Sequence, residues 1–390
     1  MRRLLIMAGY IKRKGKNYYE LVVEAGKDPA TGKRRRISKT FRGHERDARK
    51  VLVSLENEMV EGNHITPSKI TVGAYLDKWK EEHVTLRSLS PKTVESYEYI
   101  IDTHLKKAFG GLMLEKLTPF HIQDYIAIVI RRLSPRTLTY ILVVFNMALK
   151  AAVRHRLLRE NPMDFVDRPR RAKKKKMRVL TPKEIAILED AARDSFLWPV
   201  VCMALYTGMR RGEILALRWP DVDLEKRIIN VKHSMQRIIR RGIVFKEPKT
   251  EAGCRTVEIG PTVISVLRQV RREQLEHRIA YGPDYQNHDL VFCQVNGKPL
   301  DPHHMSRRFH RLATSIGLNG FRFHDLRHTH ISYLVAQGTP LSTAQERAGH
   351  GDLASTVIYT HSVPGKQREA ADRFEITFGR NPAEMPPQNI

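Results

Sequence analysis

Two stretches of the sequence hold most of its candidate functional residues. The first is Thr207–Glu213, with the sequence TGMRRGE, which leads into the apolar run Ile214–Leu217. The second is His324–Thr329, with the sequence HDLRHT, which is predicted to begin a helix. His350 then lies 23 residues after Arg327, and Tyr359 lies nine residues after His350. One segment of the chain therefore supplies arginines, histidines and a tyrosine in a fixed order.

The net charge indicates a polyanionic partner. The 390 residues include 68 Lys and Arg against 42 Asp and Glu, a formal net charge of +26. Nucleic acid is the usual partner of such an excess, and an acidic membrane surface is the alternative. No run approaches the ~18 apolar residues of a spanning helix, and the start of the chain lacks the features of a signal peptide. We therefore expect a cytoplasmic protein that binds DNA and no membrane.

The cysteines exclude two classes of small stabilised domain. Cys202, Cys254 and Cys293 are odd in number, widely spaced and free of any CxxC pattern. This pattern builds neither a disulfide framework nor a zinc site. Cys202 lies in an apolar run and is predicted to be a core residue.

Residues 1–62 are predicted to form a small β-sheet followed by a helix. Tyr18–Val23 has the aromatic and β-branched residues of a strand, Lys33–Phe41 is the returning strand, and apolar residues recur with helical spacing from His44 to Met59. The candidate DNA-binding residues on the returning strand are Arg34, Arg35 and Arg36. A basic sheet of this kind can enter a major groove, and an exposed, solvated hairpin is the alternative.

Residues 63–167 are predicted to be helical. Thr118-Pro119 and Ser134-Pro135 each place a capping residue before a proline, as Ser90-Pro91 does. Lysines and arginines flank these helices. We therefore expect a compact basic helical bundle that binds DNA, with a structural spacer as the alternative.

Residues 168–178 are predicted to be a linker, because like charges repel one another and no apolar period is present. A nuclear-import signal has similar composition, but between two basic domains a strap along a phosphate backbone is the favoured interpretation. The candidate DNA-binding residues in this linker are Arg171, Lys173, Lys174, Lys175 and Lys176.

Residues 179–390 are predicted to form a domain of helices with a short strand-rich insert and a C-terminal tail. Thr181-Pro182 caps its first helix. Lys249 lies in a turn between two strand-like runs, Ile243–Phe245 and Arg255–Ile259.

The order TGxRxxE, HxLRH, GH and Tyr resembles the tyrosine recombinase (phage integrase) family, over roughly residues 178–375. The two earlier segments are similar, more loosely, to the arm-site and core-site DNA-binding domains of that family. The resemblance implies a multidomain fold: a small N-terminal β-sheet plus helix, a helical core-binding domain and an α+β catalytic domain. It implies a site with no substituted position, made of Arg210, Lys249, His324, Arg327, His350 and Tyr359, with Glu213 supporting the first arginine.

The chemistry of these residue types suits that family. Two guanidinium groups can hold the nonbridging oxygens of a phosphodiester. Lys249 can protonate the leaving 5′ oxygen, and Tyr359 can conserve the bond energy as a 3′-phosphotyrosine without ATP. His324 and His350 can bond phosphoryl oxygens or help to remove the tyrosine proton, and the sequence does not divide these two roles. No paired carboxylates support a two-metal mechanism, so no cofactor is expected.

Three alternatives stay open at this point. A type IB-like topoisomerase would use a similar set of residues, but the N-terminal domain argues against it. A DNA-binding regulator could keep the fold without the reaction, but the intact set of residues argues against it. His324 and His328 could pair on a metal ion, but no third ligand is suitably spaced.

The resemblance also implies partners. Four copies are expected to assemble on two double-stranded DNA attachment sites, each recognised through core and arm sequences. A DNA-bending accessory protein and an excision factor are possible partners, and the bound protein would be associated with the nucleoid. The N-terminal domain favours an integrase of a prophage or an integrative conjugative element.

Overall fold

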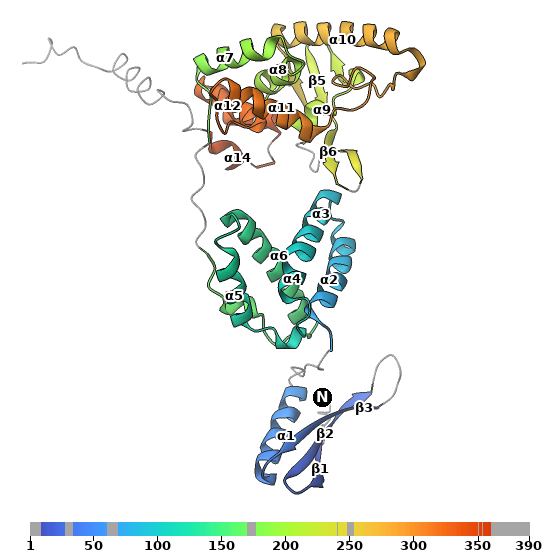
Figure 1. The fold of residues 1–390 in the computed structure, drawn as a ribbon, viewed down its shortest axis with the longest axis vertical. Helices are drawn as coiled ribbons and strands as arrows, with labels where there is room; N and C mark the ends of the chain where they lie inside the picture. The colour runs from blue at the N-terminus through green and yellow to red at the C-terminus, as the bar shows by residue number, and fades with distance from the viewer. Residues whose placement is uncertain are drawn as a thin grey trace, which may run out of the picture. The chain divides into compact units, whose positions relative to one another are not determined.

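The computed structural model describes residues 9–27, 34–60, 69–169, 177–239, 241–247, 253–349, 351–352 and 354–359. For residues 25–27, 34–35 and 58–60 it describes the backbone alone. The chain divides into two compact units, Met1–Lys173 and Lys174–Ile390, and each is described by itself (Figure 1).

The first unit begins with an antiparallel sheet in the order β1-β2-β3 and a helix that lies against it (Figure 1). Its elements are β1 (Gly9–Gly15), β2 (Tyr18–Lys27), β3 (Arg34–Arg42) and α1 (Glu45–Val60). Tyr19, Leu21 and Val23 alternate along β2 and therefore share one face. They form a core with the residues of α1 that face them: Ala48, Leu52 and Leu55. The predicted sheet and helix are confirmed, with β1 as a further strand.

The rest of the first unit is a helical bundle with its own core. Its elements are α2 (Val72–Arg87), α3 (Pro91–Ile100), the π-helical segment η1 (Ile101–Leu105), α4 (Lys106–Phe109), α5 (Pro119–Val129), α6 (Pro135–Arg154), and the short 3₁₀ segments η2 (Leu114–Lys116) and η3 (Pro162–Phe165). The predicted starts are confirmed in atomic detail. Ser90, Thr118 and Ser134 each accept a hydrogen bond from a backbone amide of the first turn, and proline follows each of them.

Helix α6 is the core helix of this bundle. By length and composition it is long and apolar enough to cross a membrane, and it is the one such helix among the described residues. One helix of this kind is weak evidence for a membrane span, because core helices of soluble proteins have the same composition. Its apolar side is buried in the bundle, with Leu138, Ile141, Phe145 and Leu149 almost fully enclosed. Packing within the bundle explains the apolar residues of α6.

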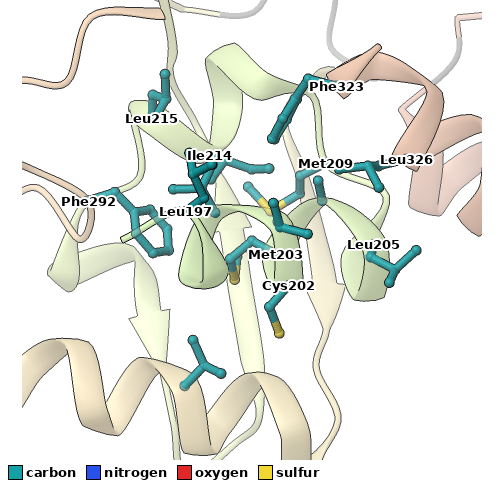
Figure 2. Packing of buried hydrophobic residues seen from close by; sticks show 14 of the residues in the cluster. Leu197, Cys202, Met203, Leu205, Met209, Ile214, Leu215, Phe292, Phe323 and Leu326 are labelled. Atoms are coloured by element: carbon teal, nitrogen blue, oxygen red, sulfur yellow. The ribbon is translucent and has the colours of Figure 1, made fainter. Parts of the chain in front are cut away.

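The second unit is built of helices around one large apolar core. Its helices are α7 (Pro182–Arg193), α8 (Trp198–Thr207), α9 (Arg211–Leu215), α10 (Pro261–Tyr281), α11 (Pro302–Ser315), α12 (Phe323–Ala336), α13 (Leu341–Ala348) and α14 (Ala354–Val357), with 3₁₀ segments η4 (Trp219–Asp221) and η6 (Gly282–Asp284). Figure 2 shows side chains from α8, α9 and α12 meeting in this core, among them Met203, Ile214 and Leu326. Cys202 is fully buried there, as its apolar surroundings predicted.

The strands of the second unit form two small sheets. They are β4 (Val222–Asp223), β5 (Ile228–Val231), β6 (Ser234–Ile238), β7 (Gly242–Lys246) and β8 (Arg255–Glu258). One sheet has the order β4-β5-β8, and the other is the hairpin β6-β7. The sequence predicts that Lys249 lies in a turn between two strands. β7 and β8 are those strands, and they belong to different sheets. β7 pairs with β6, where its first residue, Gly242, lies opposite Ile238 with a φ of +72°, and β8 pairs with β5.

The described residues thus hold four separate apolar clusters: one between the first sheet and α1, one in the helical bundle, and a large one and a small one in the second unit. The domain boundaries predicted from the sequence at residues 62, 167 and 178 stay predictions.

Candidate functional site

Arg210 stands at the start of α9, where the chain turns sharply. α8 ends at Thr207, and its C-cap is Gly208, whose left-handed φ of +67° suits glycine. The carboxylate of Glu213 accepts hydrogen bonds from the backbone amide of Arg210 at 2.9 Å and from its Nη1 at 2.7 Å. The spacing of three residues therefore lets one carboxylate cap the helix and orient the arginine.

Glu213 also binds a second arginine, which the sequence did not single out. Nη2 of Arg255, on β8, donates to Oε2 of Glu213 at 2.9 Å, and the exposed fractions of these two side chains are 3% and 5%. Burial alone would raise the pKa of Glu213. Hydrogen bonds and charge from Arg255 and Arg210 outweigh burial, so the pKa is lowered. At neutral pH Glu213 is therefore an ionised anchor for two arginines.

Arg327 is one of the largest fully buried side chains among the described residues, with an exposed fraction of 2%. Its Nη1 donates to the carbonyl of Gly208 at 2.7 Å, and its Nη2 donates to the carbonyl of Ala348 at 2.5 Å. Burial, and then the charge of Arg210, lowers the pKa of Arg327 to about 9. The guanidinium is still charged at neutral pH, and both bonds require its protons.

Three consecutive carbonyls at the end of α13 each accept a hydrogen bond from a different arginine. Arg255 donates through Nε to residue 347 at 2.8 Å, Arg327 to Ala348, and Arg210 through Nη2 to Gly349 at 2.9 Å. The last carbonyls of a helix lack partners within the helix and carry partial negative charge. The end of α13 therefore fixes the positions of the three arginines together.

His330, on α12, contacts residues of both α8 and α13. Nδ1 of His330 lies 2.8 Å from the carbonyl of Leu205, and its Nε2 accepts a hydrogen bond from Nε of Arg347 at 3.1 Å. Burial, and then the charge of Arg347, lowers the pKa of His330 to about 3. The ring therefore stays neutral. It also lies close to Gly208, where a Cβ would be only 2.6 Å from the ring, so that a larger residue does not fit.

Tyr359 lies two residues beyond α14 with an exposed fraction of 3%. It shares a small apolar cluster with Ile331 and Ala348. Its hydroxyl is 2.7 Å from Nδ1 of His328. Burial raises the pKa of Tyr359, and the charges of Arg327 and Arg210 oppose that effect.

His324 lies one turn before His328 on α12, and the two rings meet edge to face with centroids 4.7 Å apart. Desolvation, and then the charges of His328 and Arg327, lowers the pKa of His324 to about 4, although part of the residue stays open to solvent. His324 is therefore a neutral ring at physiological pH.

The structure thus brings together five of the seven residues that the resemblance implied: Arg210, Glu213, His324, Arg327 and Tyr359. Lys249 and His350 lie outside the described residues, as do the linker residues Arg171, Lys173, Lys174, Lys175 and Lys176. Of the arginines on β3, Arg36 is exposed and has an ion pair with Glu24 at 3.5 Å, while Arg34 and Arg35 are described by backbone alone.

Sequence reasoning missed Arg255 and His328 as members of this site. Arg255 begins a strand that the sequence did predict, and nothing local shows that its side chain meets Glu213. His328 is the last residue of the HxLRH motif, and its spacing from His324 suggests only a metal ligand. Across the described ranges, no group of three His, Cys, Asp or Glu side chains is placed to hold a metal ion.

Two family models match the chain. Residues 178–365 match the model described as "Phage integrase family", and residues 71–128 match "Phage integrase, N-terminal SAM-like domain". The matches fall in the second unit and in the helical bundle.

Curated relatives match nearly the whole chain. "Tyrosine recombinase XerC-like" of Caldanaerobacter subterraneus subsp. tengcongensis is 26% identical over 393 residues, which cover 95% of this chain and 98% of the relative. The ICEBs1 integrase of Bacillus subtilis is 27% identical over 373 residues, which cover 94% and 99%.

Solved structures share the fold. The Tn1549 transposon integrase, residues 82–397 in complex with a circular intermediate DNA, has a TM-score of 0.65 at 21% identity and covers 78% of this chain and 99% of that chain. A lambda integrase dimer bound to a COC′ core site has a TM-score of 0.56 at 19% identity and covers 92% and 96%. The expected multidomain fold is confirmed. As the two family models and the curated relatives show, the chain belongs to the phage integrase family of tyrosine recombinases, enzymes that break and rejoin DNA strands.

Proposed function

We propose that the chain is the integrase of a mobile element, and that it recombines specific DNA sites through a covalent bond between Tyr359 and a 3′ phosphate. The observation that carries this proposal is the common anchoring of the reactive groups. Arg327 donates to the carbonyl of Ala348, Arg210 donates to the next carbonyl, and Tyr359 packs in a cluster with Ala348. The end of α13 is thus in contact with both arginines and with the cluster that holds the Tyr359 ring.

Arg210 and Arg327 are assigned to the phosphate. Negative charge develops on the nonbridging oxygens during attack, and guanidinium groups fixed in advance stabilise that charge without rearranging. Each donor of this kind contributes about 10²–10³ in rate. Glu213 supports the assignment, because it orients Arg210 through both side-chain and backbone bonds.

Lys249 is assigned as the general acid for the leaving 5′ oxygen, and His324 and His350 as donors to the phosphoryl group. The neutral ring of His324 suits a hydrogen bond to a phosphoryl oxygen. The energy of the broken phosphodiester is conserved in the phosphotyrosine, so rejoining requires neither ATP nor a cofactor.

The partners follow from the same proposal. Four copies bind two attachment sites, with the N-terminal sheet on arm sequences, the helical bundle and the second unit on core sequences, and the basic linker along the backbone. Arg34, Arg35, Arg36, Arg171 and Lys173–Lys176 are assigned to DNA phosphates or grooves. A DNA-bending protein and an excision factor are further candidate partners. The proposed location is the cytoplasm, at the nucleoid when bound.

A recombination assay tests this function. A plasmid carries the two junctions of the element that encodes the chain, and loss of the segment between them is scored by amplification across the new joint. The wild type is expected to form the joint, and Arg327→Ala is expected to form none. A wild type that relaxes supercoiled plasmid lacking any junction would instead indicate a topoisomerase. Binding of the junctions without any joint or covalent complex would indicate a regulator.

A further inference from the structure

We infer that His328 accepts the proton of the Tyr359 hydroxyl during strand cleavage and returns it during rejoining. The inference rests on the proposed function and assigns it one more catalytic residue. It starts from the distance of 2.7 Å between Nδ1 of His328 and the phenol oxygen. A general base must lie within about 2.6–3.2 Å of the atom that it deprotonates, and His328 meets this condition in the free protein.

The face of α12 explains why this contact forms. His328, Ile331 and Val335 are three and seven residues apart, so they lie along one side of the helix. Tyr359 belongs to the apolar cluster of Ile331, against which Val335 packs. The ring of Tyr359 thus meets apolar side chains on this face of α12, and its hydroxyl meets the imidazole one turn nearer the start of the helix.

The surroundings keep His328 able to accept a proton. Its charged neighbours are Asp325, Arg327 and Arg322, and the rings of His324 and Tyr359 also contact it. Asp325 is paired with Arg322 at 2.8 Å, which offsets the charge of both. Burial, opposed by Asp325 and reinforced by Arg327 and Arg322, lowers the pKa of His328. A neutral ring with its proton on Nε2 leaves Nδ1 as the acceptor.

The step balances without any further reactant. The phenol O–H bond breaks and the proton passes to Nδ1 of His328, while the oxygen of Tyr359 forms a bond to phosphorus. The bond from phosphorus to the 5′ oxygen breaks, and that oxygen takes a proton from the general acid assigned to Lys249. Rejoining reverses each transfer, so both groups return to their starting protonation states.

The test follows single-turnover cleavage of a nicked attachment-core substrate by the full-length protein. His328→Ala and His328→Gln are compared with the wild type, and His304→Ala, an exposed position on α11, is the matched control. Both His328 variants are expected to cleave about 10²–10⁴-fold more slowly while they bind the substrate as the wild type does. The decline of the wild-type rate at acidic pH is expected to disappear in His328→Gln, and added imidazole is expected to restore part of the rate of His328→Ala.

A modified substrate separates the two proton transfers. Sulfur in place of the bridging 5′ oxygen makes a leaving group that needs no proton, so it is expected to rescue Lys249→Ala and not His328→Gln. A His328→Gln variant that cleaves at the wild-type rate, or that sulfur rescues, would overturn the inference. If His328→Ala does not fold, His328→Gln and His328→Asn give the same test. A wild type that forms no adduct would refute the proposed function instead, which keeps the two failures distinct.

Discussion

Replacing Glu213 with glutamine removes one negative charge from between two arginines and keeps the size of the side chain. Glu213 and Arg255 have exposed fractions of 5% and 3%, and their atoms lie 2.9 Å apart. Removing one partner of a buried ion pair costs about 3–5 kcal/mol, because the remaining charge is left buried without compensation. A cost of about 3 kcal/mol is expected here, because the glutamine oxygen can still accept one hydrogen bond. The cost does not vanish, because the amide hydrogens of glutamine face guanidinium groups, which are also donors.

The variant is expected to lose about 3 kcal/mol of unfolding free energy and about 10²–10³ in cleavage rate, because Arg210 loses its orienting partner. Denaturation is followed by fluorescence in a Trp79→Phe background, so that Trp198 and Trp219 report on the second unit alone. The lowered pKa of Glu213 means that its contribution is present above the ordinary value of 4.5 and is lost as pH falls through the folded value. The difference between wild type and variant should therefore shrink below pH 4.5. A stability difference that is small, or that does not depend on pH, would show that an ionised Glu213 does not stabilise the fold through Arg255.

Three other substitutions test further features of the structure. Gly208→Ala should lower the unfolding free energy, measured by thermal unfolding, by about 1–3 kcal/mol more than Gly317→Ala. Both positions have positive φ, but only at Gly208 would a Cβ meet a side chain, the ring of His330 at 2.6 Å. His330→Gln should make the protein less sensitive to acid: with its pKa lowered to about 3, the folded histidine resists protonation, so the wild type should lose about 2 kcal/mol more than the variant between pH 6.5 and 5. Phe145→Ala, fully buried in the helical bundle, should cost about 3–5 kcal/mol in chemical denaturation, while Val143→Ala, with an exposed fraction of 42%, should cost much less.

Local features of the fold were predictable from the sequence because they depend on neighbouring residues. Ser90, Thr118 and Ser134 cap helices that begin at the following proline, and each cap is a contact across three residues. The charge likewise predicted DNA as the class of partner, and the order of the motifs named the candidate site residues.

Non-local features were not predictable in this way. The sequence of β7 does not show whether it pairs with the strand before it or with the strand after it. In the folded structure it pairs with β6, the strand before it. The bond from Arg255 to Glu213 joins residues 42 positions apart, and that from His328 to Tyr359 joins residues 31 apart. Such contacts depend on how helices and strands pack against one another. The spacing of residues along the chain does not predict that packing.

Mapping the covalent adduct identifies the nucleophile, which we propose to be Tyr359. The wild type and Tyr359→Phe are incubated with a nicked attachment-core substrate, denatured, and digested with trypsin, which releases residues 348–366 as one peptide. We expect a nucleotide-linked form of this peptide from the wild type, with Tyr359 as the attachment site, and no adduct from Tyr359→Phe. An adduct on another peptide, or an equal amount in both proteins, would show that Tyr359 is not the nucleophile.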